Sequence, residues 1–215
     1  MRTWLQKLFG EKPAVLTADL QQRIRRSFEE SAADEEHFPS TIDPRILHVR
    51  VILQTFGDLT GKRVLDAGCG KGRFARVLQQ EHPAARIHAM DIALAMLRHV
   101  HAPLAPCAGS LTSLPYAANS FDALYATESL EHAVDIDRAV AELCRVVKPG
   151  GRIVIIDKNK DHWGRLQTPE WERWFGQREL EDKLKQHCRR VESRLISYWE
   201  DVDPDGLFLA WIAER

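Results

Sequence analysis

A glycine-rich turn and an acid one strand later are the residues of this chain with the clearest chemical meaning. Gly68, Gly70 and Gly72 follow a short apolar run and precede a helical pattern. Glycines let a backbone approach a ligand closely, and a strand-to-helix turn puts that ligand beside the first N–H groups of the helix. Asp91 ends the next apolar run, where a carboxylate can accept the hydroxyl protons of a ribose. The pattern predicts a nucleoside-containing ligand, with a ligand-free turn and a merely capping Asp91 as the alternatives.

The spacing of the glycines argues against a dinucleotide. The turn reads GxGxG, whereas nicotinamide and flavin sites read GxGxxG. Asp66 stands two residues before Gly68. An acid aimed into the pocket from there suits a cationic ammonium better than a pyrophosphate.

A parallel sheet flanked by helices would place these residues together. Short apolar runs alternate with helical patterns, which is typical of an α/β fold. We predict strands at 63–66, 86–91, 105–109, 121–126 and 152–157, and helices at 72–81, 93–101 and 137–147, the last of which stops before the turn at 148–151. A helix at 178–187 then precedes strands at 191–198 and 207–213, which an Asp203-Pro204-Asp205-Gly206 turn joins as an antiparallel pair.

The residues before the sheet read as helical. A four-residue apolar period predicts a helix over 16–28. A second helix is predicted over 43–57, with Asp43 as its N-cap, Pro44 in its first turn and Gly57 at its end. We therefore divide the chain into a helical cap at 1–60 and a core at 61–215.

Composition limits the class of protein and its partners. The 215 residues are 44% hydrophobic and 28% charged, which favours one folded domain with a sizeable core. A net charge of −1 offers no field for a polyanion, so nucleic acid is not expected as a partner. The four cysteines have no metal-ligand spacing. The start, MRTWLQKLFGEKP, lacks the apolar stretch of a signal peptide, and no run reaches the roughly 20 apolar residues of a membrane span. We expect a cytoplasmic protein without a metal, either a monomer or a homodimer.

Four segments in order resemble the class I S-adenosylmethionine-dependent methyltransferases, in particular the small-molecule, type 11-like ones. They are VLDAGCGKGRF, IHAMDIA, LPYAANSFD and ELCRVVKPGG, and the resemblance covers about residues 63–157. It implies a Rossmann-like sheet of seven strands, mostly parallel with an antiparallel last strand. It also implies S-adenosylmethionine as the cofactor and S-adenosylhomocysteine as the product.

The resemblance implies a role for particular residues. Asp91 would hold the ribose, Ile92 would pack on the adenine, and Thr127 would contact the methionine and sulfonium side. The glycine turn would hold the methionine end through Asp66, Ala67, Gly68, Cys69, Gly70 and Gly72. Gly109, Ser110 and Leu111 would flank the adenine, where Ser110 replaces the acid that the family often uses for the amino group. That departure weakens one contact without contradicting the cofactor.

The implied reaction needs little from the protein besides positioning. The methyl group is already activated on a sulfonium, so a general base is optional and depends on the acceptor. His132 and Glu128 are the candidate bases. A structural role is the alternative for His132, and a loop or cofactor contact is the alternative for Glu128.

The segment 158–178 and the N-terminal helices would cover a small, apolar or aromatic acceptor. His162 and Trp163 are the predicted substrate contacts, unless the tryptophans of this stretch simply pack a helix on the core. RNA or protein methylation, or a non-catalytic partner that keeps the fold, are the alternative functions.

Overall fold

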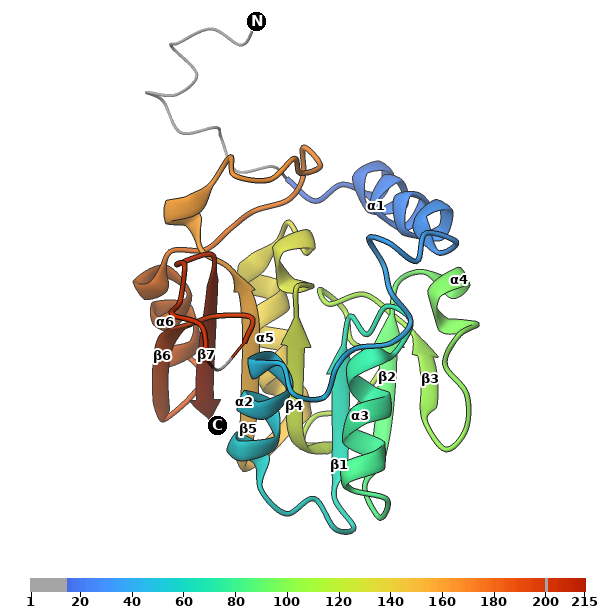
Figure 1. Ribbon diagram of the computed structural model, residues 1–215, viewed down its shortest axis with the longest axis vertical. Coiled ribbons are helices and arrows are strands. Elements are labelled where there is room, and N and C mark those ends of the chain that lie inside the picture. The colour runs from blue at the N-terminus through green and yellow to red at the C-terminus, as the bar shows by residue number, and fades with distance from the viewer. Residues whose placement is uncertain (1–14, 200) are drawn as a thin grey trace, which may run out of the picture.

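The sheet has the predicted architecture. The computed structural model describes residues 15–199 and 201–215. Seven strands form one sheet in the order β3-β2-β1-β4-β5-β7-β6, in which β7 runs antiparallel to both of its neighbours (Figure 1). The strands are β1 (Arg63–Ala67), β2 (Arg86–Asp91), β3 (Ala105–Ala108), β4 (Phe121–Thr127), β5 (Val147–Lys158), β6 (Arg190–Ile196) and β7 (Phe208–Glu214). The order reverses between β1 and β4, which is where open α/β sheets bind their ligands.

Helices cover both faces of the sheet. Figure 1 shows α2 and α3 in front of it and α5 and α6 behind. One apolar cluster fills the layer under α2 and α3, and a second fills the layer under α5 and α6. The helices are α1 (Ala18–Ser31), α2 (Leu47–Phe56), α3 (Arg73–Glu81), α4 (Leu94–Leu97), α5 (Ile136–Val146) and α6 (Gln177–Lys185).

Three local predictions were wrong in detail. α2 starts at Leu47, because the Asp43 carboxylate binds the backbone and side chain of Arg45 instead of capping the helix. The helix predicted over 93–101 is reduced to the short α4. The turn predicted at 148–151 lies inside β5, where Val147 pairs with Phe121 and residue 152 already pairs with Ala123, so the residues between bulge out.

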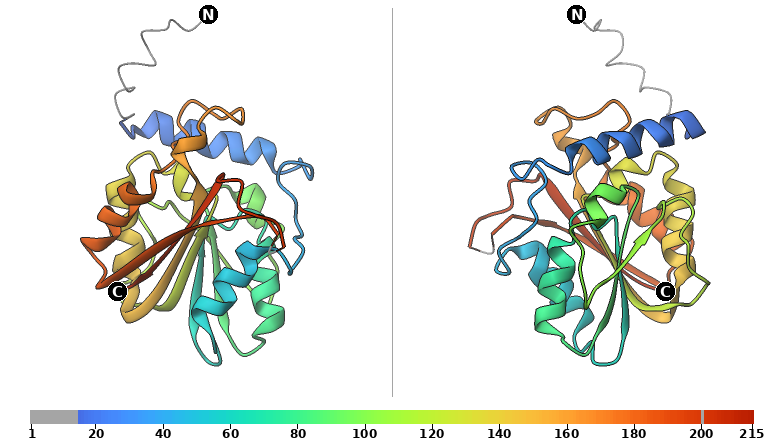
Figure 2. Two further views of the ribbon diagram at one scale, coloured as in Figure 1. Left: turned by 60° about the vertical axis from the view of Figure 1, so that its left-hand side comes forward. Right: turned by 90° about the vertical axis from the view of Figure 1, so that its right-hand side faces the viewer.

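Two segments lie over the edge of the sheet at which the parallel strands end. The first contains α1, and the second is the loop between β5 and α6; both views in Figure 2 place them at this edge. We call residues 16–40 the N-terminal cover and residues 158–178 the lid segment. α2, in contrast, packs on the sheet beside α3, so part of the predicted cap at 1–60 belongs to the helical layer.

Two expectations concern membranes and export. Among the described residues, no helix combines the length and apolar character needed to cross a bilayer. The start of the chain, in which we expected no signal peptide, lies outside the described residues.

Candidate active site

A cavity of about 570 Å³ lies between the carboxyl ends of the central strands, the N-terminal cover and the lid segment. Most of the predicted site residues line it, although they come from four separate loops. The predicted cofactor contacts on its wall are Gly68, Cys69, Gly70, Asp91, Ile92, Gly109, Ser110, Leu111 and Thr127. Both candidate bases, Glu128 and His132, also lie on the wall. The fold therefore brings together residues up to 64 positions apart, from Gly68 to His132.

Asp66, Ala67 and Gly72 do not line the cavity. Asp66 is fully buried under the glycine turn, and no described residue gives either of its oxygens a hydrogen bond of normal geometry. Burial raises the pKa of the Asp66 carboxyl to about 7, against a smaller opposing effect of the Tyr125 hydroxyl. The expectation that this acid is aimed into the pocket was wrong, because strand alternation turns its side chain into the sheet layer instead.

The N–H groups of the glycine turn are already bonded within the protein. Gly68 and Cys69 both donate to the Met90 carbonyl, at 2.8 and 2.9 Å, and Gly70 donates to Asp91 Oδ2 at 2.8 Å. Asp91 Oδ1 accepts the Ala93 N–H at 2.9 Å. The turn can therefore give a ligand open space and carbonyl oxygens, but not the N–H groups of Gly68, Cys69 and Gly70. Asp91 ties the turn to the end of β2 and keeps further lone pairs for a ligand.

Close packing explains why Gly68 has no side chain. A Cβ there would lie 2.4 Å from Ser129 Cβ, and the backbone has a φ of +83°. The Ser129 hydroxyl donates to the Ala67 carbonyl at 2.8 Å, which holds the turn against the loop after β4. At Gly70, which faces the cavity, a Cβ would meet nothing within 4 Å.

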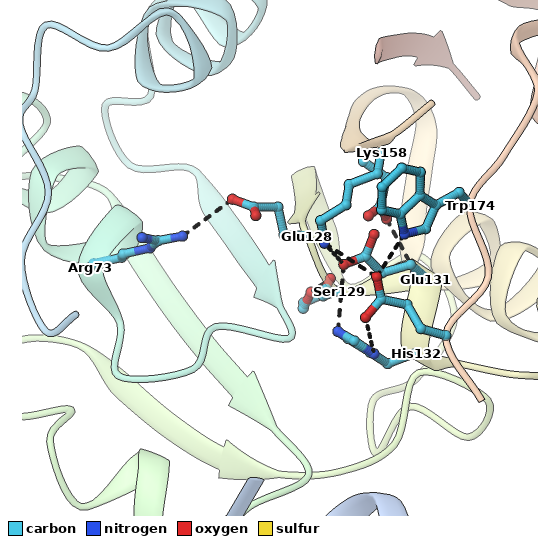
Figure 3. Close-up of polar contacts among 10 residues, drawn as sticks. Arg73, Glu128, Ser129, Glu131, His132, Lys158 and Trp174 are labelled. Carbon is cyan, nitrogen blue, oxygen red and sulfur yellow. Dashed lines mark hydrogen bonds and ion pairs between the residues drawn. The ribbon is translucent and has the colours of Figure 1, made fainter. Parts of the chain in front are cut away.

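Glu128 forms an ion pair across the cavity wall. Its carboxylate lies 3.3 Å from the Arg73 guanidinium at the start of α3 (Figure 3). Its backbone has a φ of +49°, a left-handed conformation that is strained for a non-glycine residue. The Arg73 guanidinium thus occupies the carboxylate of this candidate base.

A second polar cluster joins the loop after β4 to the lid segment. The Lys158 ammonium pairs with Glu131 (Figure 3) and also lies 3.4 Å from the Glu172 carboxylate. Burial and the neighbouring Asp157 raise the pKa of Glu131 well above its usual range. Burial also raises the pKa of Asp157, to about 6. Burial lowers the pKa of Lys158, but Glu131 more than offsets this, so Lys158 stays charged at neutral pH.

His132 is uncharged at neutral pH. Burial, followed by the nearby Lys158 charge, lowers its pKa to about 3. Its Nε2 lies 3.5 Å from Glu131 and its Nδ1 lies 3.8 Å from Glu172, which are distances too long for strong hydrogen bonds. The Phe28 ring of α1 packs edge-on against it at 5.0 Å. With this pKa, His132 is a weak proton acceptor, which favours its structural role over that of a general base.

The same cluster contains three groups that could ligate a metal. The ligand atoms of Glu131, His132 and Glu172 lie within 4.8 Å of one another. Lys158 contacts both of these carboxylates, so a positive charge is already supplied there by the chain itself.

The predicted substrate contacts lie away from the cavity. Trp163 is 53% exposed and packs edge-on against Trp174, at 5.3 Å. His162 packs against Gly206 of the β6–β7 connection. The aromatic side chains that do line the cavity are Phe28, Phe38, Phe74 and Trp171. Of the two on the N-terminal cover, Phe28 belongs to the four-residue period of α1, which is the sequence signal that could have found it.

Comparisons with known proteins show the family of this chain. Residues 65–155 match the family described as a methyltransferase domain. A malonyl-acyl-carrier-protein O-methyltransferase of Pectobacterium atrosepticum is 35% identical over 72% of this chain and 67% of its own length. The enzyme of that name from Dechloromonas aromatica is 32% identical over 67% of this chain and 53% of its own length. A solved structure of the 4+2 cyclase SpnF superposes with a TM-score of 0.74 at 17% identity, over 91% of this chain and 96% of that one, which shows a shared fold.

Several relatives are longer than the matched region. Three of them match this chain over 35–53% of their own length. The sheet order, the glycine turn and the match to the Pectobacterium protein nevertheless agree on one family. The chain belongs to the class I S-adenosylmethionine-dependent methyltransferases.

Proposed function

We propose that this protein transfers the methyl group of S-adenosylmethionine to a small-molecule acceptor by in-line displacement. One observation carries the proposal. Nine of the twelve residues predicted to bind the cofactor, which come from separate loops, line one cavity of about 570 Å³. That volume is in the range of about 300–1,000 Å³ that small-molecule sites occupy.

The chemistry of the wall fits this cofactor. Asp91 has lone pairs left for ribose hydroxyls after binding two backbone N–H groups. Gly70 leaves open space for a ligand beside the turn. The Ser110 hydroxyl lies 3.0 Å from the Thr112 hydroxyl, and either can donate, so Ser110 is able to accept from an adenine amino group. We assign Ile92 and Leu111 to the adenine faces and Thr127 to the methionine side.

The chain contributes mainly position and exclusion of water. Bound S-adenosylmethionine supplies a methyl group on a sulfonium, which needs no metal for its transfer. The N-terminal cover and the lid segment close the cavity from above, which shields the reacting atoms. Because His132 is a weak base and Glu128 is paired with Arg73, we propose that proton removal contributes little and that alignment of the acceptor contributes most.

We propose an apolar or aromatic acceptor. The part of the wall formed by the cover and the lid segment carries the aromatic rings of Phe28, Phe38 and Trp171, and the aliphatic side chains of Ile24 and Leu166. Such a wall stabilises an apolar body by excluding water from it. The names of the relatives, which describe transfer to an acyl-carrier-bound malonyl group, support a small acceptor group.

The remaining parts of the proposal concern partners and location. We propose that no metal and no nucleic acid take part, and that the protein works in the cytoplasm as a monomer or homodimer. The near-zero net charge and the four free thiols support this. No observation favours RNA or protein methylation, or a non-catalytic role.

Calorimetry with S-adenosylhomocysteine tests the cofactor assignment, and formation of S-adenosylhomocysteine over a panel of acyl, quinone-like and phenolic acceptors tests the reaction. We expect binding heat and product with at least one apolar acceptor. The absence of both heat and a thermal shift would overturn the proposal. Binding without product from any acceptor would favour the non-catalytic alternative.

A further inference from the structure

Two of the contacts that hold the N-terminal cover lie next to proposed cofactor contacts, and we call these two its anchors. Elsewhere Arg23 pairs with Glu170 of the lid segment, and Arg76 donates to the Ser40 carbonyl. The first anchor is in the glycine turn, and the second is at the start of α4, directly after β2. The cover also carries Phe28 and Phe38 on the wall assigned to the acceptor. A single segment therefore contacts both halves of the site.

Lys71 forms the first anchor. It lies between Gly70 and Gly72, and its side chain is only 1% exposed. Its ammonium donates to Glu35 Oε1 at 2.6 Å and to the Asp34 carbonyl at 3.3 Å, both on the cover. The Glu35 carboxylate also accepts the Ser40 N–H at 2.8 Å. A buried ammonium with these partners is costly to separate from them, so the cover and the turn hold each other in place.

Glu29 forms the second anchor. Its two carboxylate oxygens accept the N–H groups of Leu94 and Ala95, each at 2.8 Å. A small apolar cluster packs α1 and the following loop on α4 beside this contact. It consists of Ala32, Ala93 and Met96, with Phe28, Phe38 and Ala95 packed against them. Because α4 begins three residues after Asp91, movement of the end of β2 moves this anchor as well.

A hydrogen bond links the two anchors. Gly70, the neighbour of Lys71, donates to Asp91 Oδ2 at 2.8 Å. A ligand that binds both Gly70 and Asp91 fixes the two anchors relative to each other. An element held at both points then has only one favourable position.

We propose that Glu29, Glu35 and Lys71 are positioning residues that couple cofactor binding to the closing of the N-terminal cover over the acceptor. This rests on the proposed function. Cofactor binding orders the cover, and the ordered cover completes the apolar wall, so the acceptor binds after the cofactor. By linkage, the same contacts must strengthen cofactor binding when the acceptor is present.

Hydrogen exchange of the full chain, read by mass spectrometry with and without saturating S-adenosylhomocysteine, tests the coupling. In the wild type we expect the amides of residues 17–40 to exchange about fivefold more slowly, or slower still, when the ligand is bound. In Glu29→Gln and Glu35→Gln, calorimetry still detects the ligand, but this gain in protection is reduced, and in the double variant it is lost. Asp43→Asn is the matched control, because Asp43 pairs with Arg45 beyond the cover, and it keeps the full gain.

The outcomes separate the two proposals. If the wild type binds the ligand while the exchange of residues 17–40 is unchanged, the coupling is overturned and the proposed function stands. Full gains in both Glu variants and in the double variant would also overturn it. If the wild type binds no ligand, the proposed function fails and the coupling fails with it. The wild-type comparison needs no variant, so a variant that does not fold leaves the test intact.

Discussion

Replacing Asp91 by Asn tests both the proposed ribose contact and the two backbone hydrogen bonds that Asp91 accepts. Each Asp91 oxygen accepts one backbone N–H, from Gly70 at 2.8 Å and from Ala93 at 2.9 Å. An Asn amide keeps one acceptor and turns an NH₂ donor toward the other N–H. One hydrogen bond to a charged group is lost, which by itself costs up to about 3 kcal/mol of unfolding free energy. Burial raises the pKa of Asp91, so removal of the buried charge offsets part of this cost. The ribose contact weakens as well, so the affinity for S-adenosylhomocysteine should fall by about tenfold or more.

Urea unfolding and calorimetry measure the two effects separately. Asp122→Asn is the control, because Asp122 accepts the Arg63 N–H at 2.9 Å and the Lys148 ammonium at 2.6 Å at the opposite end of β4. It should lower stability and leave affinity unchanged. Unchanged affinity in Asp91→Asn would remove Asp91 from the ribose site, and a clear gain in stability would argue against the two backbone contacts.

Further predictions concern pH, packing and metals. Burial lowers the pKa of His48 to about 4. Below pH 6.5 the unfolded state therefore binds a proton that the folded state binds only near pH 4, so stability should fall by up to about 3 kcal/mol as the pH is lowered through that window. Urea unfolding at several pH values measures this fall, which should be smaller in His48→Leu. Gly68→Ala should destabilise far more than Gly150→Ala, because both have positive φ but only the former meets Ser129; equal unfolding midpoints would argue against that contact. Chelation of divalent ions should leave ligand affinity and the thermal midpoint unchanged, since Lys158 already pairs with the carboxylates of the possible metal cluster; a lowered midpoint would contradict this.

The strand, turn and helix order could be predicted from the sequence because neighbouring residues encode it. The alternation of apolar runs, the glycines at 68–72 and the Asp203–Gly206 turn each act over a few positions. The parallel strands end at one edge of the sheet, so their loops had to meet. This is why most of the predicted cofactor contacts line one cavity.

The direction and charge of individual side chains depended on tertiary packing. The glycine turn predicted an acid aimed at a ligand, but Asp66 is buried under that turn. The tryptophan content of the lid segment predicted Trp163 as a substrate contact, but Trp163 does not line the cavity. Phe28, which lies on a helix 135 residues earlier, does line it and packs against His132. The pKa of His132 depends on its burial and on the charge of Lys158, which lies 26 positions away in the sequence. Neither effect can be read from the residues next to His132. Local sequence thus determined which loops form the site, while desolvation and long-range packing decided what each side chain in them can do.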